Sequence, residues 1–434
     1  MKISGMRNPF GGGIRVRNRT LLSWLALIVS LWSVLFCSIN NLPGPASFIK
    51  YLPDGILLVM LLLCIGRKKA VIKRNVLLPL KVALAFFIFC FLVYLFRYQS
   101  VAYFLWGFRN NFRFYIAFFV FVAYLDETDV GTWFKTMDIL FWVNAVLSVL
   151  QFVVLGIDGD SLGGIFGIQG GSNGFTMCFM SVVVGKSLLE NFHGEEKTVM
   201  SLLKCAAAIM IATMAEMKFF FFVMIYLLIA AAIMTHFSAK KVIYLLLTLG
   251  SLMLAAALLV EWFGFEGFFS LERLWESATQ QNYSSSGDIN RLSAIPGLIQ
   301  RLDLSLLEQT FGMGLGNCDT SAFAVCNTPF YQQYGYLHYT WFTSAMVFLE
   351  TGYVGLGIYL SFFAVCFYRA RKNNKDGVGN QLFNRLAVIM SLLCAVLVVY
   401  NSSLRIEAGY MVYFVLALPF MRQSSEDTED YTQR

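Results

Sequence analysis

Charged residues are scarce in this chain of 434 residues: Asp, Glu, Lys and Arg make up 14% of it, whereas hydrophobic residues make up 58%. Soluble domains carry about 25% charged residues, so the composition excludes an ordinary soluble domain. The apolar runs are continuous and lack the alternation of a transmembrane β-barrel. Backbone polar groups in lipid must be bonded within their own segment. The sequence therefore predicts an all-α, polytopic membrane helical bundle.

Several motifs are also missing. The chain has no P-loop and no Cys/His spacing typical of zinc sites, so it offers no pattern for a nucleotide, a metal or another cofactor. The first apolar run is too long for a cleavable signal peptide and lacks a small-residue cleavage site, so we expect it to stay as an anchor. The net charge of +7 is interpreted as a consequence of membrane topology, not of nucleic-acid binding.

What is present is a series of apolar stretches, each long enough as a helix to cross a hydrocarbon core of about 30 Å. The seventh and eighth stretches are separated only by residues 215–217, but 199–236 is nearly twice the length that one crossing needs. We predict about twelve transmembrane helices, at residues 21–39, 46–65, 76–96, 109–125, 133–156, 172–189, 199–214, 218–236, 242–260, 340–367, 382–400 and 405–421.

Basic residues predict the orientation, because loops that stay in the cytoplasm are enriched in Lys and Arg. With this set of helices, the basic clusters at 7–19, 67–74, 240–241 and 369–375 all fall on one side. We assign that side to the cytoplasm, together with both termini. The predicted organisation is a cytoplasmic segment (1–20), spans one to nine (21–260), a large extracytoplasmic loop (261–339), spans ten to twelve (340–421) and a cytoplasmic tail (422–434).

The large loop between spans nine and ten is the one long polar interruption of the chain. It contains an amphipathic segment at 288–299, expected at the membrane interface, and the glycine run 312–316. No strand–turn–helix pattern surrounds that run, so it is not a nucleotide-binding fingerprint. Cys318 and Cys326 both lie in this loop, and their spacing leaves open whether they form a disulfide. The remaining polar residues of interest in the loop are Arg273, Asp288, Arg291, Arg301, Asp303 and His338.

Basic residues also lie at the predicted outer ends of several spans. Arg109 and Arg113 share one helical face, where they either snorkel to the interface or line a site for an anionic headgroup. Lys218 either pairs with Glu216 or binds phosphate. Arg405 is expected to form an interfacial ion pair with Glu407.

Three further side chains need an explanation. His338 begins the return into span ten and is either a proton acceptor or a structural histidine. Glu350 lies about three turns into span ten and must face the protein interior with a partner. Asn173 follows the glycine-rich segment 163–171, expected to be flexible, and is a candidate helix cap.

Together these features resemble the O-antigen polymerases and O-antigen ligases of bacterial envelopes, which are integral-membrane glycosyltransferases of the GT-C type. The resemblance covers the topology of about twelve spans with one large outer loop. Its motifs are residues 167–173, the basic residue before span eight, Asn290-Arg291-Leu292 followed by the run 312–316, and His338 with residues 350–356. Where members of the family usually carry arginine before span eight, this chain has Lys218.

The resemblance implies an inverting glycosyltransferase that needs neither a metal ion nor a cofactor and acts in the bacterial cytoplasmic (inner) membrane. His338 and Arg291 would be catalytic, while Arg291, Lys218, Arg109 and Arg113 would bind diphosphate. Asn173, Glu350 and Arg405 would support them. Its partners would be an undecaprenyl-diphosphate-linked oligosaccharide donor and acceptor, the lipid bilayer and, as further candidates, a chain-length regulator and a flippase, but no nucleic acid.

Three functions remain open. The first is a polymerase of O-antigen, capsule or exopolysaccharide repeat units, and the second is a ligase that moves finished polysaccharide to a lipid acceptor. The third is a transporter or flippase of lipid-linked oligosaccharides. Against the third, the chain shows no internal repeat of the kind common in transporters, and its polar groups gather at one membrane face. On the polymerase interpretation, the outer loop is a lid over a membrane cavity.

Overall fold

The computed structural model describes residues 12–40, 42–66, 76–97, 99–235, 239–263, 287–321 and 323–421. Within these ranges every regular element is a helix, which confirms the predicted all-α class. Arg273, the basic cluster at 67–74 and the predicted tail at 422–434 lie outside the described residues.

Among the described residues, thirteen long or medium helices form the body of the bundle. They are α1 (Gly12–Ser30), α2 (Trp32–Asn40), α3 (Leu52–Gly66), α4 (Leu77–Arg97), α5 (Val101–Tyr124), α6 (Glu127–Val153), α7 (Asn173–His193), α8 (Thr198–Met214), α9 (Lys218–Ile233), α10 (Ala239–Phe263), α15 (Thr343–Asp376), α16 (Gln381–Tyr400) and α17 (Ala408–Ala417). Shorter pieces connect them: η1 (Gly44–Tyr51), η2 (Gly159–Ser161), η3 (Gly164–Phe166), α12 (Ala294–Leu302), α13 (Leu306–Phe311), η4 (Ala324–Cys326), α14 (Pro329–Tyr334), η5 (Gly335–Leu337), η6 (Tyr339–Trp341) and η7 (Leu418–Phe420).

Five helical stretches among the described residues are long and apolar enough to cross a membrane. They are Ala46–Gly66, Leu77–Arg97, Glu127–Val153, Thr343–Asp376 and Gln381–Tyr400. A sixth is obtained if Leu21–Ser30 and Trp32–Asn40, which meet at a bend of 64°, count as one broken span. The chain is thus consistent with a multi-pass membrane protein, while the count of about twelve spans stays a prediction.

The first predicted span is not a single straight helix, whereas the seventh and eighth follow the prediction. The first is broken at Leu31, where α1 ends and α2 begins. The seventh and eighth are separate helices, as predicted: α8 ends at Met214 and α9 begins at Lys218, with Glu216 between them at a φ of 49°. Such a positive φ is unusual for a residue with a side chain and reverses the chain within a few residues.

The tenth predicted span is also interrupted. At Gly352 in α15 the backbone leaves the helical region, with φ 64° and ψ −170°. A helix broken inside a bundle must have its freed carbonyls bonded by other groups. Here the N–H of Met313 donates to the carbonyl of Leu349 over 2.8 Å, and the N–H of Gly314 donates to that of Glu350 over 3.0 Å. The predicted outer loop therefore completes the hydrogen bonding of α15.

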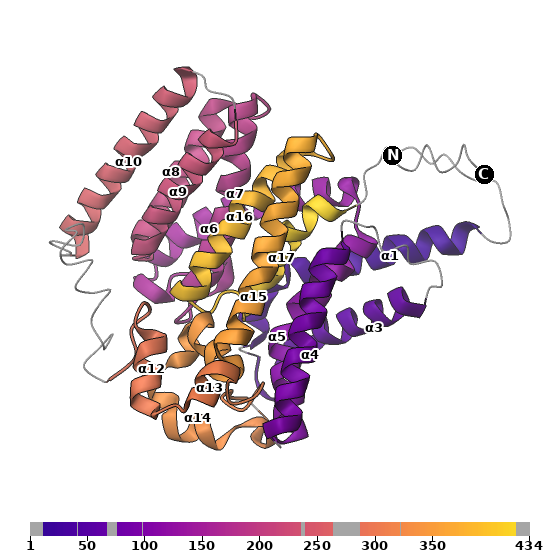
Figure 1. Cartoon of the computed structure of the whole chain (residues 1–434). Coiled ribbons are helices and arrows are strands. Elements are labelled where there is room, and N and C mark those ends of the chain that lie inside the picture. The colour runs from indigo at the N-terminus through magenta and orange to yellow at the C-terminus, as the bar shows by residue number, and fades with distance from the viewer. Residues whose placement is uncertain are drawn as a thin grey trace.

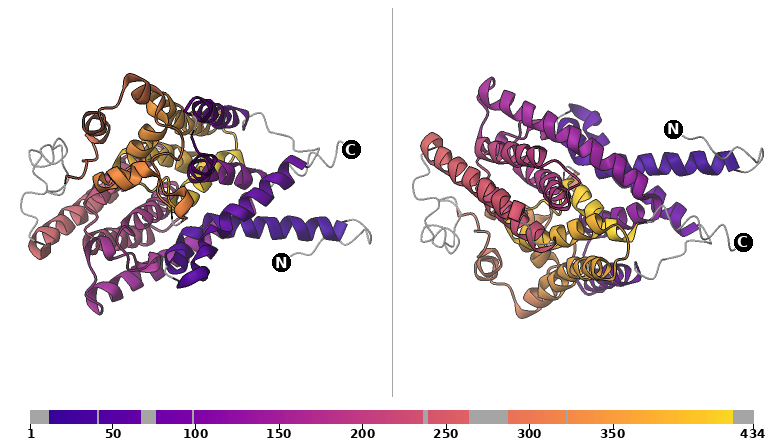
Figure 2. Two further views of the ribbon diagram at one scale, coloured as in Figure 1. Left: turned by 90° about the horizontal axis from the view of Figure 1, so that it is seen from below. Right: turned by 90° about the horizontal axis from the view of Figure 1, so that it is seen from above.

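The described part of the loop lies at one end of the bundle. Figure 1 shows α12, α13 and α14 together at this end, where α12 and α13 contact α15. We call it the outer end, after the orientation predicted from the basic residues. The two views of Figure 2 show α10 on one flank of the molecule and α1 with α3 on the opposite flank.

The predicted amphipathic segment forms a helix only in its second half. The helix α12 begins at Ala294, buries Ala294 and Leu298 and leaves Gln300 exposed. The apolar side of the segment thus faces the protein, and Arg291 precedes the helix in a turn.

Candidate functional site

Three chain segments bring basic and aromatic side chains together at the outer end. The guanidinium carbon of Arg291, before α12, lies 4.5 Å from the ring centroid of Tyr400 at the end of α16. The Tyr400 ring stacks on Phe219, with the centroids 3.8 Å apart and the planes at 17°. Phe219 directly follows Lys218, whose ammonium is close enough to Arg291 to be repelled by its charge. We call Lys218 and Arg291, with this aromatic pair, the basic cluster.

Acidic groups border the basic cluster on the α8–α9 turn and on η2. Burial raises the pKa of Glu216 above its usual 4.5, and the negative charges of Asp158 and Asp160 add to the rise while Lys218 opposes it. Glu216 and Asp160 also act electrostatically on Lys218. Lys218 thus lies within electrostatic reach of carboxylates that offset its repulsion by Arg291.

Asn173, at the start of α7, links these segments but does not cap its helix. Its side-chain amide donates to Asp160 Oδ1 over 2.6 Å and to the carbonyl of Ala215 over 3.2 Å. Its own Oδ1 is buried and accepts no hydrogen bond from the described residues. The predicted capping role is therefore wrong, because the side chain ties η2 to the α8–α9 turn instead.

His338 lies on a segment that runs beside the segment that carries Arg291. The N–H of Ile289 donates to the carbonyl of Leu337 over 3.2 Å, so the segments that carry Arg291 and His338 run side by side. The imidazole stacks on Trp341 with centroids 4.1 Å apart. It is partly exposed, and neither of its nitrogens bonds to a side chain or backbone group among the described residues. His338 has a φ of 52°, a left-handed conformation that holds it at the turn into α15.

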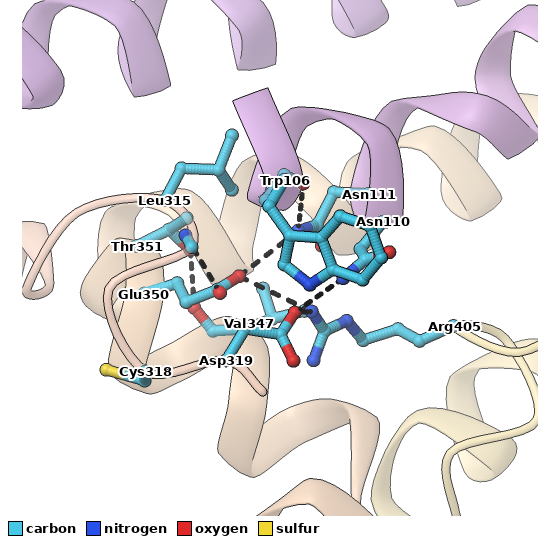
Figure 3. Close-up of polar contacts among 12 residues, drawn as sticks. Trp106, Asn110, Asn111, Leu315, Cys318, Asp319, Val347, Glu350, Thr351 and Arg405 are labelled. Atoms are coloured by element: carbon cyan, nitrogen blue, oxygen red, sulfur yellow. Dashed lines mark hydrogen bonds and ion pairs between the residues drawn. The ribbon is translucent and has the colours of Figure 1, made fainter. Parts of the chain in front are cut away.

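A second group of charges is buried deeper, between α5, α15 and the glycine run (Figure 3). Glu350 is fully buried; its Oε1 accepts from the N–H of Gly316 over 2.9 Å and its Oε2 from Asn111 Nδ2 over 3.1 Å. Arg405 Nη2 lies 3.5 Å from Glu350 Oε2 and 3.2 Å from Asp319 Oδ2. Asn110 donates to the same oxygen of Asp319 over 2.7 Å. Glu350 therefore faces the interior with a partner, as predicted, and the partners are Arg405, Asn111 and Gly316.

The expected pair between Arg405 and Glu407 does not form. Glu407 instead accepts from Arg113 Nη1 over 2.6 Å, and Arg113 Nη2 donates to the carbonyl of Arg405 over 2.9 Å. The side chains of Arg113 and Glu407 are only 6% and 7% exposed. Arg113 is thus an internal ion-pair partner, while its role as a diphosphate ligand stays a prediction. Burial of both charges requires them to stay paired.

Arg109 is likewise bonded to side chains of the protein, while its predicted role at an anionic headgroup stays a prediction. Its Nε donates to Asp54 Oδ2 over 2.8 Å and its Nη1 to Asn110 Oδ1 over 2.7 Å. The guanidinium carbon lies 4.8 Å from the ring centroid of Tyr51 and 5.1 Å from that of Trp106. Arg109 and Arg113 share a helix but take different acidic partners.

The glycine run 312–316 is a packing element, consistent with the prediction that it is no nucleotide fingerprint. A Cβ on Gly312 would lie 2.3 Å from the backbone nitrogen of Thr351, and one on Gly316 would lie 1.9 Å from the carbonyl oxygen of Tyr103. On α5, a Cβ on Gly107 would lie 2.4 Å from the nitrogen of Gly316. The run therefore wedges between α5 and α15, and the described part of the loop is packed into the bundle, unlike a loose lid.

The cysteines and the first glycine-rich segment also have defined places. Cys318 and Cys326 are free thiols, and burial raises the pKa of both, that of Cys318 most.

Segment 163–171 is held by Gln151, whose side chain bonds both the N–H and the carbonyl of Gly164. A Cβ on Gly164 would meet Asn144 Oδ1 at 2.2 Å, and one on Gly163 would lie 2.6 Å from Cβ of Ser172, so these two glycines serve close packing.

Sequence reasoning missed several participants. Asp319 follows the noted Cys318, and Asn110 and Asn111 lie between the two noted arginines, but no pattern marked them. Tyr400 ends a long apolar stretch and Asp54 is an isolated acid, so neither has a local signal. An amide side chain at the predicted outer end of a span was the cue available for two of them, Asn110 and Asn111.

Comparison with known proteins does not add a family. No protein-family model matches the chain, and no curated protein matches it.

Proposed function

We propose that this chain is a bacterial membrane glycosyltransferase that polymerises oligosaccharide repeat units carried on undecaprenyl diphosphate, at the extracytoplasmic face. The observation that carries the proposal is the convergence of Lys218 and Arg291 from distant segments, with His338 on the neighbouring stretch of chain. Two cations near each other suit a diphosphate, and an adjacent imidazole with unbonded nitrogens suits a hydroxyl that loses its proton.

In this reaction the oxygen of an acceptor hydroxyl bonds to the anomeric carbon of the donor sugar. The bond between that carbon and the diphosphate oxygen breaks, with inversion. His338 takes the hydroxyl proton, a general-base role that contributes typically 10²- to 10⁴-fold. Arg291 and Lys218 stabilise the charge that grows on the leaving diphosphate. The acidic neighbours of Lys218 would keep the two cations together before the donor binds.

The buried network of Glu350, Asp319 and Arg405 supports the proposal indirectly. It has no room for a ligand of its own, because its oxygens already accept from Gly316, Asn110, Asn111 and Arg405. Its contribution would be to hold the segment bearing Arg291 and His338 against α5 and α15. The three predicted supporting residues divide accordingly: Asn173 borders the basic cluster, while Glu350 and Arg405 fix the outer segment.

The test is chain extension by purified protein supplied with lipid-linked repeat units. We expect Arg291→Ala to lower the rate by at least about 10²-fold, since it removes a charge that stabilises the transition state. His338→Gly should lower it by about 10²- to 10⁴-fold; glycine is chosen because it accepts the φ of 52° without strain. Gln300→Ala, an exposed truncation on α12, is the matched control and should extend chains normally.

The products distinguish the proposal from the other two functions. Wild-type chain lengths in both site variants, at normal membrane levels, would remove the site assignment. Accumulation of long, carrier-bound chains after gene deletion would indicate a ligase in place of a polymerase. Movement of labelled lipid-linked oligosaccharide across liposomes without a new glycosidic bond would indicate a transporter.

A further inference from the structure

A second group of cations lies at the end of the bundle opposite the outer end. The helix α7 begins beside the basic cluster, has 21 residues and ends at His193. Cations from two other helices lie against its last two residues. The ammonium of Lys241, from the start of α10, lies 5.2 Å from the ring centroid of Phe192. Arg385, from the start of α16, donates from Nη1 to Nε2 of His193. We call Lys241, Arg385 and His193 the inner basic site.

His193 holds Arg385 without neutralising its charge. Nδ1 of His193 lies 2.8 Å from the carbonyl oxygen of Leu189. A carbonyl only accepts and a guanidinium only donates, so Nδ1 carries the proton, Nε2 accepts from Arg385 and the imidazole is uncharged. Nε of Arg385 donates over 3.0 Å to Oδ1 of Asn374, which is also uncharged. Glu195, whose side chain is exposed, attracts the guanidinium electrostatically. Neutral hydrogen-bond partners therefore fix the position of this positive charge.

Lys241 supplies the second positive charge of the site. Its side chain is buried, and Nζ donates to Oγ1 of Thr235 over 2.6 Å. The ammonium is close enough to Arg385 to be repelled by the guanidinium charge. Two like charges held near each other raise the energy of the protein, and an anion that contacts both removes this cost. The inner basic site thus favours an anionic occupant.

Exposed apolar side chains begin directly beside the inner basic site. On α10, Ile243 and Leu246 are 60% and 64% exposed, and Ile243 is two residues after Lys241. On α9, Ile233 is 76% exposed and is two residues before Thr235, the hydrogen-bond partner of Lys241. Figure 2 shows α10 on one flank of the molecule. The site therefore lies where a cationic end of the bundle meets an apolar flank.

We propose that the inner basic site binds the phosphate of an anionic phospholipid, whose hydrocarbon chains lie against the exposed apolar side chains of α9 and α10. Nη2 of Arg385 bonds no other described residue and can donate to a phosphate oxygen, while Lys241 adds a point charge. Basic pockets between transmembrane helices on the cytoplasmic side of a membrane bind such headgroups. A zwitterionic phospholipid carries its own cation, which Lys241 and Arg385 would repel. Inorganic phosphate has the charge but gains nothing from the apolar flank.

The experiment measures lipid binding by the purified full-length protein with native mass spectrometry. The protein, in a neutral detergent, is titrated with phosphatidylglycerol, with phosphatidylcholine and with inorganic phosphate. We expect phosphatidylglycerol to bind at least about tenfold more tightly than phosphatidylcholine, because only the former brings net negative charge to the two cations. Lys241→Gln and Arg385→Gln should each lower this preference about fivefold. Lys135→Gln, an exposed lysine on α6 at the same end of the bundle, is the matched control and should leave it unchanged.

Three results would overturn the inference. Equal affinities of the wild-type protein for the two phospholipids would show that the cations select no lipid. An unchanged preference in a folded double variant, Lys241→Gln with Arg385→Gln, would place the lipid elsewhere. Inorganic phosphate that binds as tightly as phosphatidylglycerol would make the occupant a free anion.

Two features keep the test independent of folding and of the proposed function. If the double variant fails to fold, Arg385→Lys, which retains the charge, should keep most of the preference, and its loss there would contradict the role of charge. The inner basic site lies at the opposite end of the bundle from Lys218 and Arg291, and chain extension is measured separately. Loss of the lipid preference therefore leaves the proposed function as it is.

Discussion

At the scale of single residues, the fold separates charges that the sequence could not tell apart. Arg109, Arg113, Lys218, Arg291 and Arg405 all occur at predicted outer ends of spans or in the outer loop. The structure gives Arg113, Arg405 and Arg109 acidic partners and brings Lys218 within electrostatic reach of Arg291, Glu216 and Asp160. Two positive charges in one place suit a diphosphate. For this reason the proposed function assigns that role to Lys218 and Arg291.

Arg113 and Glu407 allow a direct test of whether Arg113 serves only as an internal ion-pair partner. Arg113→Ala leaves Glu407 buried and unpaired, a loss that typically costs about 3–5 kcal/mol. The double variant Arg113→Met with Glu407→Leu removes both charges and should recover most of the stability. We expect it to extend chains near the wild-type rate, as measured with lipid-linked repeat units. A double variant that is stable but inactive would indicate that Arg113 does bind the diphosphate.

At the scale of elements, glycines decide how the outer segment meets the bundle. The break of α15 at Gly352 frees two carbonyls, and the N–H groups of Met313 and Gly314 bond them. A Cβ on Gly352 would lie 2.3 Å from the carbonyl oxygen of Thr310, so the two breaks in regular structure are fitted to each other. The long predicted helix and the glycine run are thus one packing unit, although 34 residues separate Gly316 from Glu350.

Gly316→Ala tests this unit. The new methyl group would meet the Tyr103 carbonyl at 1.9 Å, and the φ of 84° disfavours any side chain. Overpacking of this kind costs about 1–3 kcal/mol, so we expect the thermal-unfolding midpoint in detergent to fall by several degrees. Gly357→Ala, on the exposed side of α15 with nothing within 4 Å of the added Cβ, is the matched control. It should leave the midpoint unchanged or raise it slightly; equal effects of the two variants would disprove the fit.

At the scale of the whole molecule, the polar groups divide between the two ends of the bundle. The basic cluster and the buried network lie at the outer end. Lys204 pairs with Asp138 and Glu196 near the other end of α7, where Lys186 pairs with Glu190. The helix α7 has 21 residues, and a helix of that length spans about 30 Å. The two groups of charges are therefore separated by about the thickness of a hydrocarbon core.

The predicted orientation places these ends on opposite sides of the membrane. A membrane-impermeant maleimide applied to intact spheroplasts should label Gln332→Cys on α14, which is exposed at the outer end. Glu195→Cys, exposed after α7, should react only after permeabilisation. The background is a Cys326→Ser protein, because Cys326 is itself partly exposed at the outer end. Labelling of both sites in intact spheroplasts would contradict the twelve-span topology.

The sequence by itself determined that the described part of this protein is helical and that several of its helices are long and apolar enough to cross a membrane. Helix hydrogen bonds join residues four apart, and hydropathy is a property of a local stretch, so both can be read along the chain. It also indicated the two-helix turn at 215–217 and the inward position of Glu350. Each of these depends on neighbours in sequence or on the cost of charge in lipid.

Only the tertiary structure decided which polar groups are partners. Arg113 and Glu407 are 294 positions apart, and Asn110 and Asp319 are 209 apart. Coulomb attraction and hydrogen bonding act through space, and any of several carboxylates could have served each arginine. The same holds for the rings of Tyr51, Trp106 and Phe323, which meet because three helical segments converge. The sequence named the charged residues, and the packing of the helices decided which groups each of them lies against.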